Sequence, residues 1–162
     1  MENKVAKKYT LLQARTKMES WCAYQERSHF EVKEKLYAWG LYATEVDEII
    51  GHLITNNYLN EQRFAEAFVS GKFKIKGWGR TKIKQALKLK KVSEPNIKYA
   101  FQQLDEGEYR QKLKTIAVKK NKLIKEKHPL KRKYKLITYL SAKGFEHELV
   151  NEVVKEILQH DE

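Results

Sequence analysis

The sequence predicts an all-α fold of three tandem three-helix repeats. The 162 residues include only two prolines and seven glycines, which leaves little turn-forming sequence for a many-stranded sheet. Long windows are rich in Lys, Glu, Leu and Ala, which favour helix. Leu36, Leu87 and Leu140 recur at separations of 51 and 53 residues with matching apolar neighbours. Because small repeats are stabilised by packing against the adjacent repeats in the chain, we expect an elongated, curved molecule.

The internal repeat extends beyond the three leucines. The residues ten, fourteen and seventeen positions after each leucine are apolar in all three copies. Steps of four and three residues place side chains on one helical face, so each copy supplies a face to be buried. We expect a first repeat with an N-terminal extension over residues 1–59, a second over 60–106 and a third over 107–162. The apolar positions are Val46, Ile50, Leu53, Ile97, Phe101, Leu104, Val150, Val154 and Ile157.

Capping residues predict the helices of the first repeat. A first helix covers about residues 11–25. Ser28 starts a second helix, with Glu31 three positions later at the capping-box spacing. Gly40 is typical of a helix end, and Thr44 is expected to cap a third helix.

The second repeat contains an ambiguous stretch. Asn60 is expected to cap its first helix. Residues 72–76 then alternate lysine with apolar side chains, a pattern that is also typical of a strand. Because no nearby segment could pair with such a strand, we assign the stretch to a helix end before the turn at Gly77 and Gly79.

The remaining helices follow from the same signals. In the second repeat a second helix follows the glycines and runs through Leu87, and Ser93 opens the third helix. In the third repeat a helix covers about residues 108–124, and Pro129 starts the next one, since proline is tolerated in a first turn. Gly144 then separates it from a last helix that ends near Leu158. The sequence therefore predicts nine helices.

The charge balance indicates an anionic partner. Thirty-three Lys and Arg stand against 21 Asp and Glu, which gives a net charge of +12 and an isoelectric point of about 9.6. Residues 1–59 are balanced, so the whole excess lies in the last two repeats. Such a field attracts nucleic acid, an acidic membrane surface or an acidic protein face.

Cysteine content and hydropathy suggest a compartment. Cys22 is the single cysteine, which excludes a scaffold held by disulfides within the chain. We find neither an apolar run of about 18 residues, the length of a membrane span, nor an N-terminal signal peptide. We expect a cytoplasmic protein without a membrane partner.

Two basic segments form the candidate binding surface. Residues 72–91 hold nine Lys and Arg and no acidic residue, and residues 110–135 hold twelve against Glu126 alone. Trp39, Trp78 and the tyrosines could stack on bases, although helical spacing also suits a core position. The candidate partner-binding or nucleic-acid-binding residues are Lys72, Lys74, Lys76, Arg80, Lys84, Lys88, Lys91, Lys119, Lys120, Lys122, Lys131, Arg132 and Lys135.

Part of the first basic segment could form a stripe on one helix. If Gly79 opens a helix, four basic residues follow at steps of four, four and three: Arg80, Lys84, Lys88 and Lys91. Like charges at this spacing repel one another, which favours an anionic partner. The alternative is a face that is simply solvated.

The catalytic and cofactor motifs that we considered are incomplete. The glycines of the 77–79 turn lack the third glycine and the preceding strand of a dinucleotide site. The segment 147–151 has Asn151 where a zinc protease needs its second histidine. We therefore expect a protein that is not an enzyme and holds no cofactor or metal.

Several segments together resemble a known family. In order, these are RSHFE at 27–31, KL at 35–36, YLNEQRFA at 58–65, Gly79, KI at 82–83, Leu87, YL at 139–140 and KGF at 143–145. Together they resemble the signatures of the bacterial RecX regulatory proteins over about residues 20–158. Lys91 departs from the pattern, because a glycine is common at that position in the middle repeat.

The resemblance implies a non-enzymatic modulator of the RecA recombinase. Such proteins bind in the groove of the RecA–DNA filament, contact adjacent protomers, and limit filament growth, ATP hydrolysis and strand exchange. The implied partners are the RecA filament and the single- or double-stranded DNA within or beside it, and we expect a monomer. A general nucleic-acid-binding protein without a recombinase partner would fit the charge equally well. An enzyme acting on nucleic acid would need a carboxylate cluster or nucleophile that we do not find.

Overall fold

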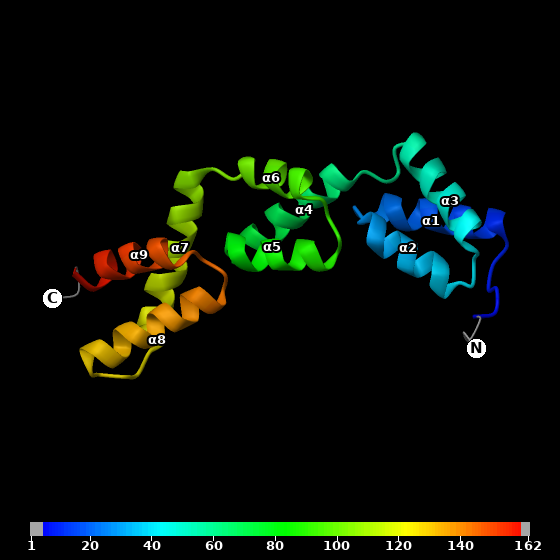
Figure 1. Ribbon diagram of the computed structural model, residues 1–162. Helices are drawn as coiled ribbons and strands as arrows, with labels where there is room; N and C mark the ends of the chain where they lie inside the picture. Colours follow the sequence, from blue (N-terminus) through cyan, green and yellow to red (C-terminus); the bar gives the residue numbers. More distant parts are fainter. Residues whose placement is uncertain (1–4, 160–162) are drawn as a thin grey trace. The chain divides into compact units, whose positions relative to one another are not determined.

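The structure, a computed structural model, describes residues 5–159 (Figure 1). Within that range it contains nine α-helices and no strands, which confirms the all-α repeat fold. The helices are α1 Leu11–Tyr24, α2 His29–Ala38, α3 Ala43–Thr55, α4 Glu61–Lys74, α5 Arg80–Leu89, α6 Glu94–Gln102, α7 Glu106–Leu123, α8 Pro129–Ala142 and α9 His147–Gln159.

The chain divides into two compact units. Unit 1 comprises the chain up to Ala67 together with Leu87–Ile97, and unit 2 comprises Phe68–Ala86 together with the chain from Lys98 onward. In the sequence, unit 1 holds 12 Lys and Arg against 11 Asp and Glu, whereas unit 2 holds 21 against 10. Unit 1 is therefore close to neutral at +1, and unit 2 carries +11 of the net charge.

The core of unit 1 lies between α1, α2 and α3. Each helix buries residues three or four positions apart, as expected for one apolar face. Fully buried side chains include Met18 from α1, Leu36 from α2 and Leu53 from α3. The half-buried rings of Tyr9 and Trp39 pack against this core edge to face, with centroids 5.0 Å apart.

The core of unit 2 is centred on α7, α8 and α9. Leu113 of α7, Leu140 of α8 and Val153 of α9 are fully buried. Tyr109 is also fully buried, and its ring stacks on Phe73 from the end of α4 at a centroid distance of 5.7 Å. The end of α4 therefore belongs to the same core as the third set of helices.

The repeat predicted from the three leucines recurs in the backbone. Leu36, Leu87 and Leu140 are all fully buried, as predicted. Four positions after each leucine the chain enters the left-handed region, with φ of 81° at Gly40, 60° at Lys91 and 97° at Gly144. In each copy the next residue donates its N–H to the leucine carbonyl at 3.2–3.4 Å, which is the helix-ending Schellman hydrogen bond.

Most predicted helix starts are confirmed. The side chains of Ser28 and Asn60 each accept a hydrogen bond from the N–H three residues later, at 3.0 Å in both cases. Pro129 lies in the first turn of α8. α4 extends to Lys74, so the alternating stretch at 72–76 is mostly helical and not a strand.

The cap predicted for α3 is wrong. The N-cap is Tyr42, not Thr44, and α3 begins at Ala43. The carboxylate of Glu45 accepts a hydrogen bond from the Tyr42 N–H at 3.1 Å, so a glutamate in the first turn satisfies the helix start in place of a threonine.

Candidate basic interface

The turn between α4 and α5 is packed against main chain. Gly77 has a φ of 66°, which glycine adopts readily. The Gly79 N–H donates to the Lys143 carbonyl at 2.8 Å, and the Thr81 N–H donates to the Gly144 carbonyl at 3.0 Å. These N–H groups therefore hold the connection between α8 and α9 instead of forming a phosphate cradle.

Lysines around this turn are partly fixed by Trp78. The Lys72 and Lys82 ammonium groups lie 4.8 and 4.5 Å from the centroids of the Trp78 rings, at cation–π distance. Lys74 and Lys76 are exposed and form no ion pair within residues 5–159. Trp78 therefore positions two cations, while two others remain available to a partner.

The Arg80 side chain makes its contacts within unit 2. Its guanidinium lies 3.8 Å from the centroid of the Tyr109 ring and pairs with Glu106 and, at 3.5 Å, with Glu146. The Arg80 N–H donates to the Tyr109 hydroxyl at 3.0 Å, and that hydroxyl donates to Glu146 at 2.8 Å. Burial raises the pKa of Tyr109 far above its ordinary value, so the phenol stays protonated. This network joins the start of α5 to α7 and to the residue before α9.

The predicted stripe of four basic residues on α5 is not formed. α5 ends at Leu89, and Lys91 lies beyond it in the left-handed region, with its ammonium 5.8 Å from the Phe30 ring centroid. Arg80, at the other end of the stripe, is engaged with Tyr109 and two glutamates. Lys84 and Lys88 remain exposed on α5, and Lys88 lies 3.4 Å from Glu94.

One face of α7 forms a shallow groove of about 400 Å³. The Thr115 hydroxyl donates to the Gln111 carbonyl at 2.9 Å, and the Gln111 amide approaches that hydroxyl at 3.4 Å. The Gln111 amide and the lysine ammonium groups along this face provide donors for an anionic chain. The lining residues are Gln111, Lys114, Thr115, Val118, Lys119 and Lys122.

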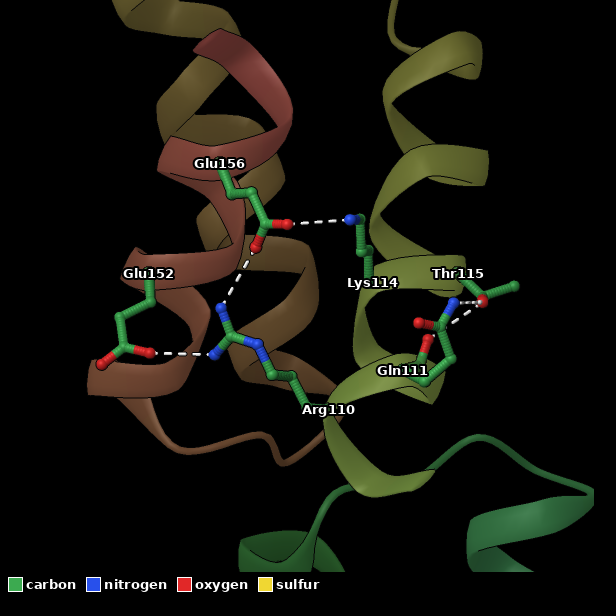
Figure 2. Close-up of polar contacts among 6 residues, drawn as sticks. All are labelled: Arg110, Gln111, Lys114, Thr115, Glu152 and Glu156. Atoms are coloured by element: carbon green, nitrogen blue, oxygen red, sulfur yellow. Dashed lines mark hydrogen bonds and ion pairs between the residues drawn. The ribbon is translucent and has the colours of Figure 1, made fainter. Parts of the chain in front are cut away.

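α9 neutralises the N-terminal half of α7. Figure 2 shows the Arg110 guanidinium between Glu152 at 2.9 Å and Glu156 at 3.1 Å, with the Lys114 ammonium 2.8 Å from Glu156. The hydrogen bond from Lys114, followed by the Arg110 guanidinium, lowers the pKa of Glu156. These cations are therefore compensated before any partner binds.

The C-terminal half of α7 keeps more of its charge. Lys119 and Lys122 are exposed and form no ion pair within the part of the chain that the structure describes. Lys120 instead lies 4.5 Å from the Tyr139 ring centroid. Lys131 is also exposed, and Lys135 lies 3.6 Å from Glu126. These predicted cations therefore lie along the C-terminal half of α7 and the first half of α8.

Arg132 closes the connection between α7 and α8. Its guanidinium donates to the Asn121 side chain at 3.0 Å, to the Ile124 carbonyl at 2.7 Å and to the Glu126 carbonyl at 3.0 Å. It also donates to the Asn121 carbonyl. Because these donors satisfy carbonyls at the end of α7, Arg132 acts mainly in folding, and little of its hydrogen-bonding capacity is left for a partner.

Sequence reasoning missed an apolar line on α8. Leu130 and Tyr134 are 71% and 72% exposed, and both line a groove together with Ile137. The signal was present, because these apolar residues are spaced by four and three positions and lie out of step with the buried Leu136 and Leu140.

Residues 5–159 provide neither a metal-binding cluster nor a reactive thiol. That range contains no group of three or more His, Cys, Asp and Glu that could hold a metal ion. Burial raises the pKa of the Cys22 thiol to about 11, so this thiol is protonated at neutral pH and is a poor nucleophile. None of the described helices is both long and apolar enough to cross a membrane.

The fold and the charge define a basic helical-repeat protein. Residues 60–100 match the second three-helix domain of RecX, and residues 107–154 match the third. The regulatory protein RecX of Acinetobacter baylyi is 32% identical over 135 residues, which cover 82% of this chain and 80% of that protein. The chain belongs to the RecX family.

A second relative is similar in sequence, and two crystal structures have a similar fold. The regulatory protein RecX of Clostridium perfringens is 29% identical over 133 residues, covering 81% of this chain and 62% of that protein. The chain therefore spans less than two thirds of that relative. The crystal structure of RecX from Lactobacillus salivarius has a TM-score of 0.81 at 22% identity and covers 90% of this chain and 95% of that one. A second crystal structure of a regulatory protein RecX has the same TM-score at 23% identity, covering 90% of this chain and 73% of that one.

Proposed function

We propose that this chain is a non-enzymatic modulator of the RecA recombinase. It binds as a monomer in the groove of the RecA–DNA filament and limits filament growth, ATP hydrolysis and strand exchange. Membership of the RecX family supports regulation of RecA, because the relatives are named as regulatory proteins. The protein acts in the cytoplasm, where the filament forms.

The proposed contact with DNA rests on the net positive charge of unit 2. Unit 2 holds 21 Lys and Arg against 10 Asp and Glu. Ion pairs with α9 compensate Arg110 and Lys114, whereas Lys119 and Lys122 keep their charge beside the hydrogen-bonding groups of Gln111 and Thr115. A groove that offers ammonium and amide donors suits a phosphate backbone without demanding a particular base sequence.

An indirect effect on ATP hydrolysis is consistent with the local chemistry. The main-chain N–H groups at Gly79 and Thr81 are occupied by carbonyls of Lys143 and Gly144, so this turn offers no site for a nucleotide phosphate. The protein would therefore change RecA turnover through the length or conformation of the filament. Several weak contacts along a filament add up through multivalency, so individual contacts need not be strong.

The test is a RecA ATPase assay on single-stranded DNA with increasing amounts of the purified chain. We expect hydrolysis to fall as the chain is added and filaments to shorten in parallel. The chain alone should hydrolyse neither ATP nor DNA. Unchanged hydrolysis and filament length at saturating concentration would contradict the proposal.

A general nucleic-acid-binding protein is the competing function that the charge of unit 2 also suits. It is distinguished by comparing binding to a preformed RecA filament with binding to the same DNA without RecA, at several salt concentrations. A modulator of RecA prefers the filament. A general binder shows equal or stronger binding to bare DNA, with the steep salt dependence of phosphate contacts.

A further inference from the structure

α8 carries two apolar lines on different sides of the helix. The inner line, Leu136 and Leu140, is fully buried in the core of unit 2. The outer line consists of Leu130, Tyr134 and Ile137, spaced four and three residues apart on one helical face. A helix that only packed against the core would need the inner apolar line and not the outer one.

The outer line is the floor of a groove, which we call the α8 groove. It has a volume of about 590 Å³ and is lined by Leu130, Lys131, Lys133, Tyr134, Lys135 and Ile137. Leu130 is 71% and Tyr134 72% exposed, so two large apolar side chains face water. The stems of the lysines extend the apolar floor, because lysine can lay its methylene groups along apolar surface while its ammonium stays in water.

The rim of the α8 groove is positively charged. Lys131 and Lys133 are exposed and form no ion pair within residues 5–159. Lys135 lies 3.6 Å from Glu126, and it is the one rim lysine with an ion pair in the described part of the chain. The groove therefore combines apolar floor with uncompensated positive charge.

This combination selects the kind of partner. A leucine and an isoleucine gain by excluding water from another apolar side chain, and a phosphate backbone offers them no such contact. Lysines around the rim favour carboxylates. The α7 groove differs in its polar groups, because it includes Gln111 and Thr115 beside Val118 and lysines, whereas the α8 groove is lined by Leu130, Tyr134, Ile137 and lysines. The two faces of unit 2 therefore suit different partners.

We propose that the α8 groove docks an acidic amphipathic segment of a partner protein. Apolar side chains of that segment cover Leu130, Tyr134 and Ile137, and its carboxylates pair with Lys131 and Lys133. Such a helix-in-groove contact uses anchors three and four residues apart. This inference rests on the proposed function, in which the partner protein is RecA, and it assigns protein contact to α8 and DNA contact to α7.

The test compares three double variants of the full-length chain. Leu130→Ser with Tyr134→Ser removes the apolar anchors, and Lys131→Glu with Lys133→Glu reverses the rim. The matched control is Leu12→Ser with Tyr24→Ser in unit 1, which removes the same two residue types from exposed positions, 62% and 83%. Because the substituted positions are exposed, circular dichroism and urea unfolding should match the unchanged protein.

Two binding measurements separate the possibilities. One uses preformed RecA filaments on single-stranded DNA, and the other uses a fluorescein-labelled thymidine oligonucleotide without RecA. We expect either α8 variant to weaken filament binding by about tenfold or more, as for loss of an anchor that contributes about 1.4 kcal/mol. Binding to the bare oligonucleotide should stay within about twofold for the serine pair, and the control should behave like the unchanged protein in both assays.

Other results overturn the inference in distinguishable ways. Unchanged filament binding by both α8 variants excludes docking at this groove. An equal loss by the serine pair on the bare oligonucleotide makes the groove a nucleic-acid contact. If the unchanged protein is a dimer by sedimentation and the serine pair is a monomer, the occupant is a second copy. If the unchanged protein binds bare DNA but not the filament, the proposed function itself fails.

Discussion

The backbones of Gly79 and Gly144 lie in direct contact. A Cβ atom added to Gly79 would lie 2.4 Å from the carbonyl carbon and oxygen of Gly144. One added to Gly144 would lie 2.4 Å from the Cβ of Lys82. Hydrogen bonds from the N–H groups of Gly79 and Thr81 hold the contact together. The two glycines therefore allow the start of α5 to pack against the connection between α8 and α9.

Gly79→Ala should destabilise the protein. The added methyl meets backbone, which can yield only if the packed segments separate, so we expect a loss of about 1–3 kcal/mol. Urea unfolding followed by circular dichroism measures it. Gly71→Ala is the matched control, since a Cβ there meets nothing within 4 Å and lies within α4. That change should stabilise by about 0.5–1 kcal/mol. Equal effects of both changes would contradict the packing described here.

Lys91→Gly should stabilise the protein. Lys91 has a φ of 60° at a position where the other two repeats have glycine. Glycine relieves the strain of the left-handed conformation, which is about 1–2 kcal/mol. This gain exceeds the free energy lost with the Phe30 contact and the entropic cost of ordering a more flexible glycine on folding. We expect a net gain of about 0.5 kcal/mol in urea unfolding. Lys90→Gly, where the ammonium pairs with Glu31 at 2.8 Å, should destabilise instead.

Tyr109→Phe should cost about 1–2 kcal/mol without changing the core volume. The hydroxyl accepts from the Arg80 N–H and donates to Glu146 Oε1, so its removal leaves that N–H without its acceptor and that oxygen without its donor. The free energy of unfolding measures the loss. Tyr134→Phe is the control, because Tyr134 is 72% exposed. A Tyr109→Phe variant as stable as that control would show that the network adds nothing.

Acid should weaken the contact between α7 and α9. Lys114 and then Arg110 lower the pKa of Glu156 from its ordinary 4.5. A lowered pKa means that the folded state binds the proton more weakly than the unfolded state. The stabilisation is therefore complete above pH 4.5 and is lost as the pH falls through the lowered pKa.

Glu156→Gln tests this dependence. The variant should be less stable than the unchanged protein at pH 7, and the difference should be smaller at about pH 3, because acid protonates Glu156 first in the unfolded state and then, below its lowered pKa, in the folded state. Urea unfolding at the two pH values provides the comparison, with the exposed Glu148→Gln as control. A difference that does not change with pH would exclude this carboxylate as the cause.

Lys119→Glu with Lys122→Glu should weaken binding to single-stranded DNA. Each lysine that contacts a phosphate releases a counterion, so losing both contacts should flatten the plot of log affinity against log salt by about 0.7 per contact. Titration of a fluorescent oligonucleotide at several salt concentrations measures the slope. Lys155→Glu, at an exposed position of α9, is the control. An unchanged slope for the double variant would remove these lysines from the DNA-binding surface.

The sequence by itself determined the helices and their repetition. Helix starts depend on residues a few positions apart, as at Ser28 and Asn60, where a side chain caps an N–H three residues later. The buried leucines follow from apolar spacing along single helices, which is also local. Such features are visible in sequence because the physical cause and its effect lie within one or two turns of helix.

Only the tertiary structure decided which charges are available to a partner. Arg80 and Lys119 are both basic residues in basic segments, yet Arg80 meets Tyr109 and Glu146 from distant parts of the chain, whereas Lys119 meets no acidic residue within 5–159. The exposure of Tyr134 depends likewise on what packs against α8. A charge or an apolar side chain looks the same in a sequence whether or not a partner covers it. Chain folding brings that partner from tens of residues away, so local spacing carries no record of it.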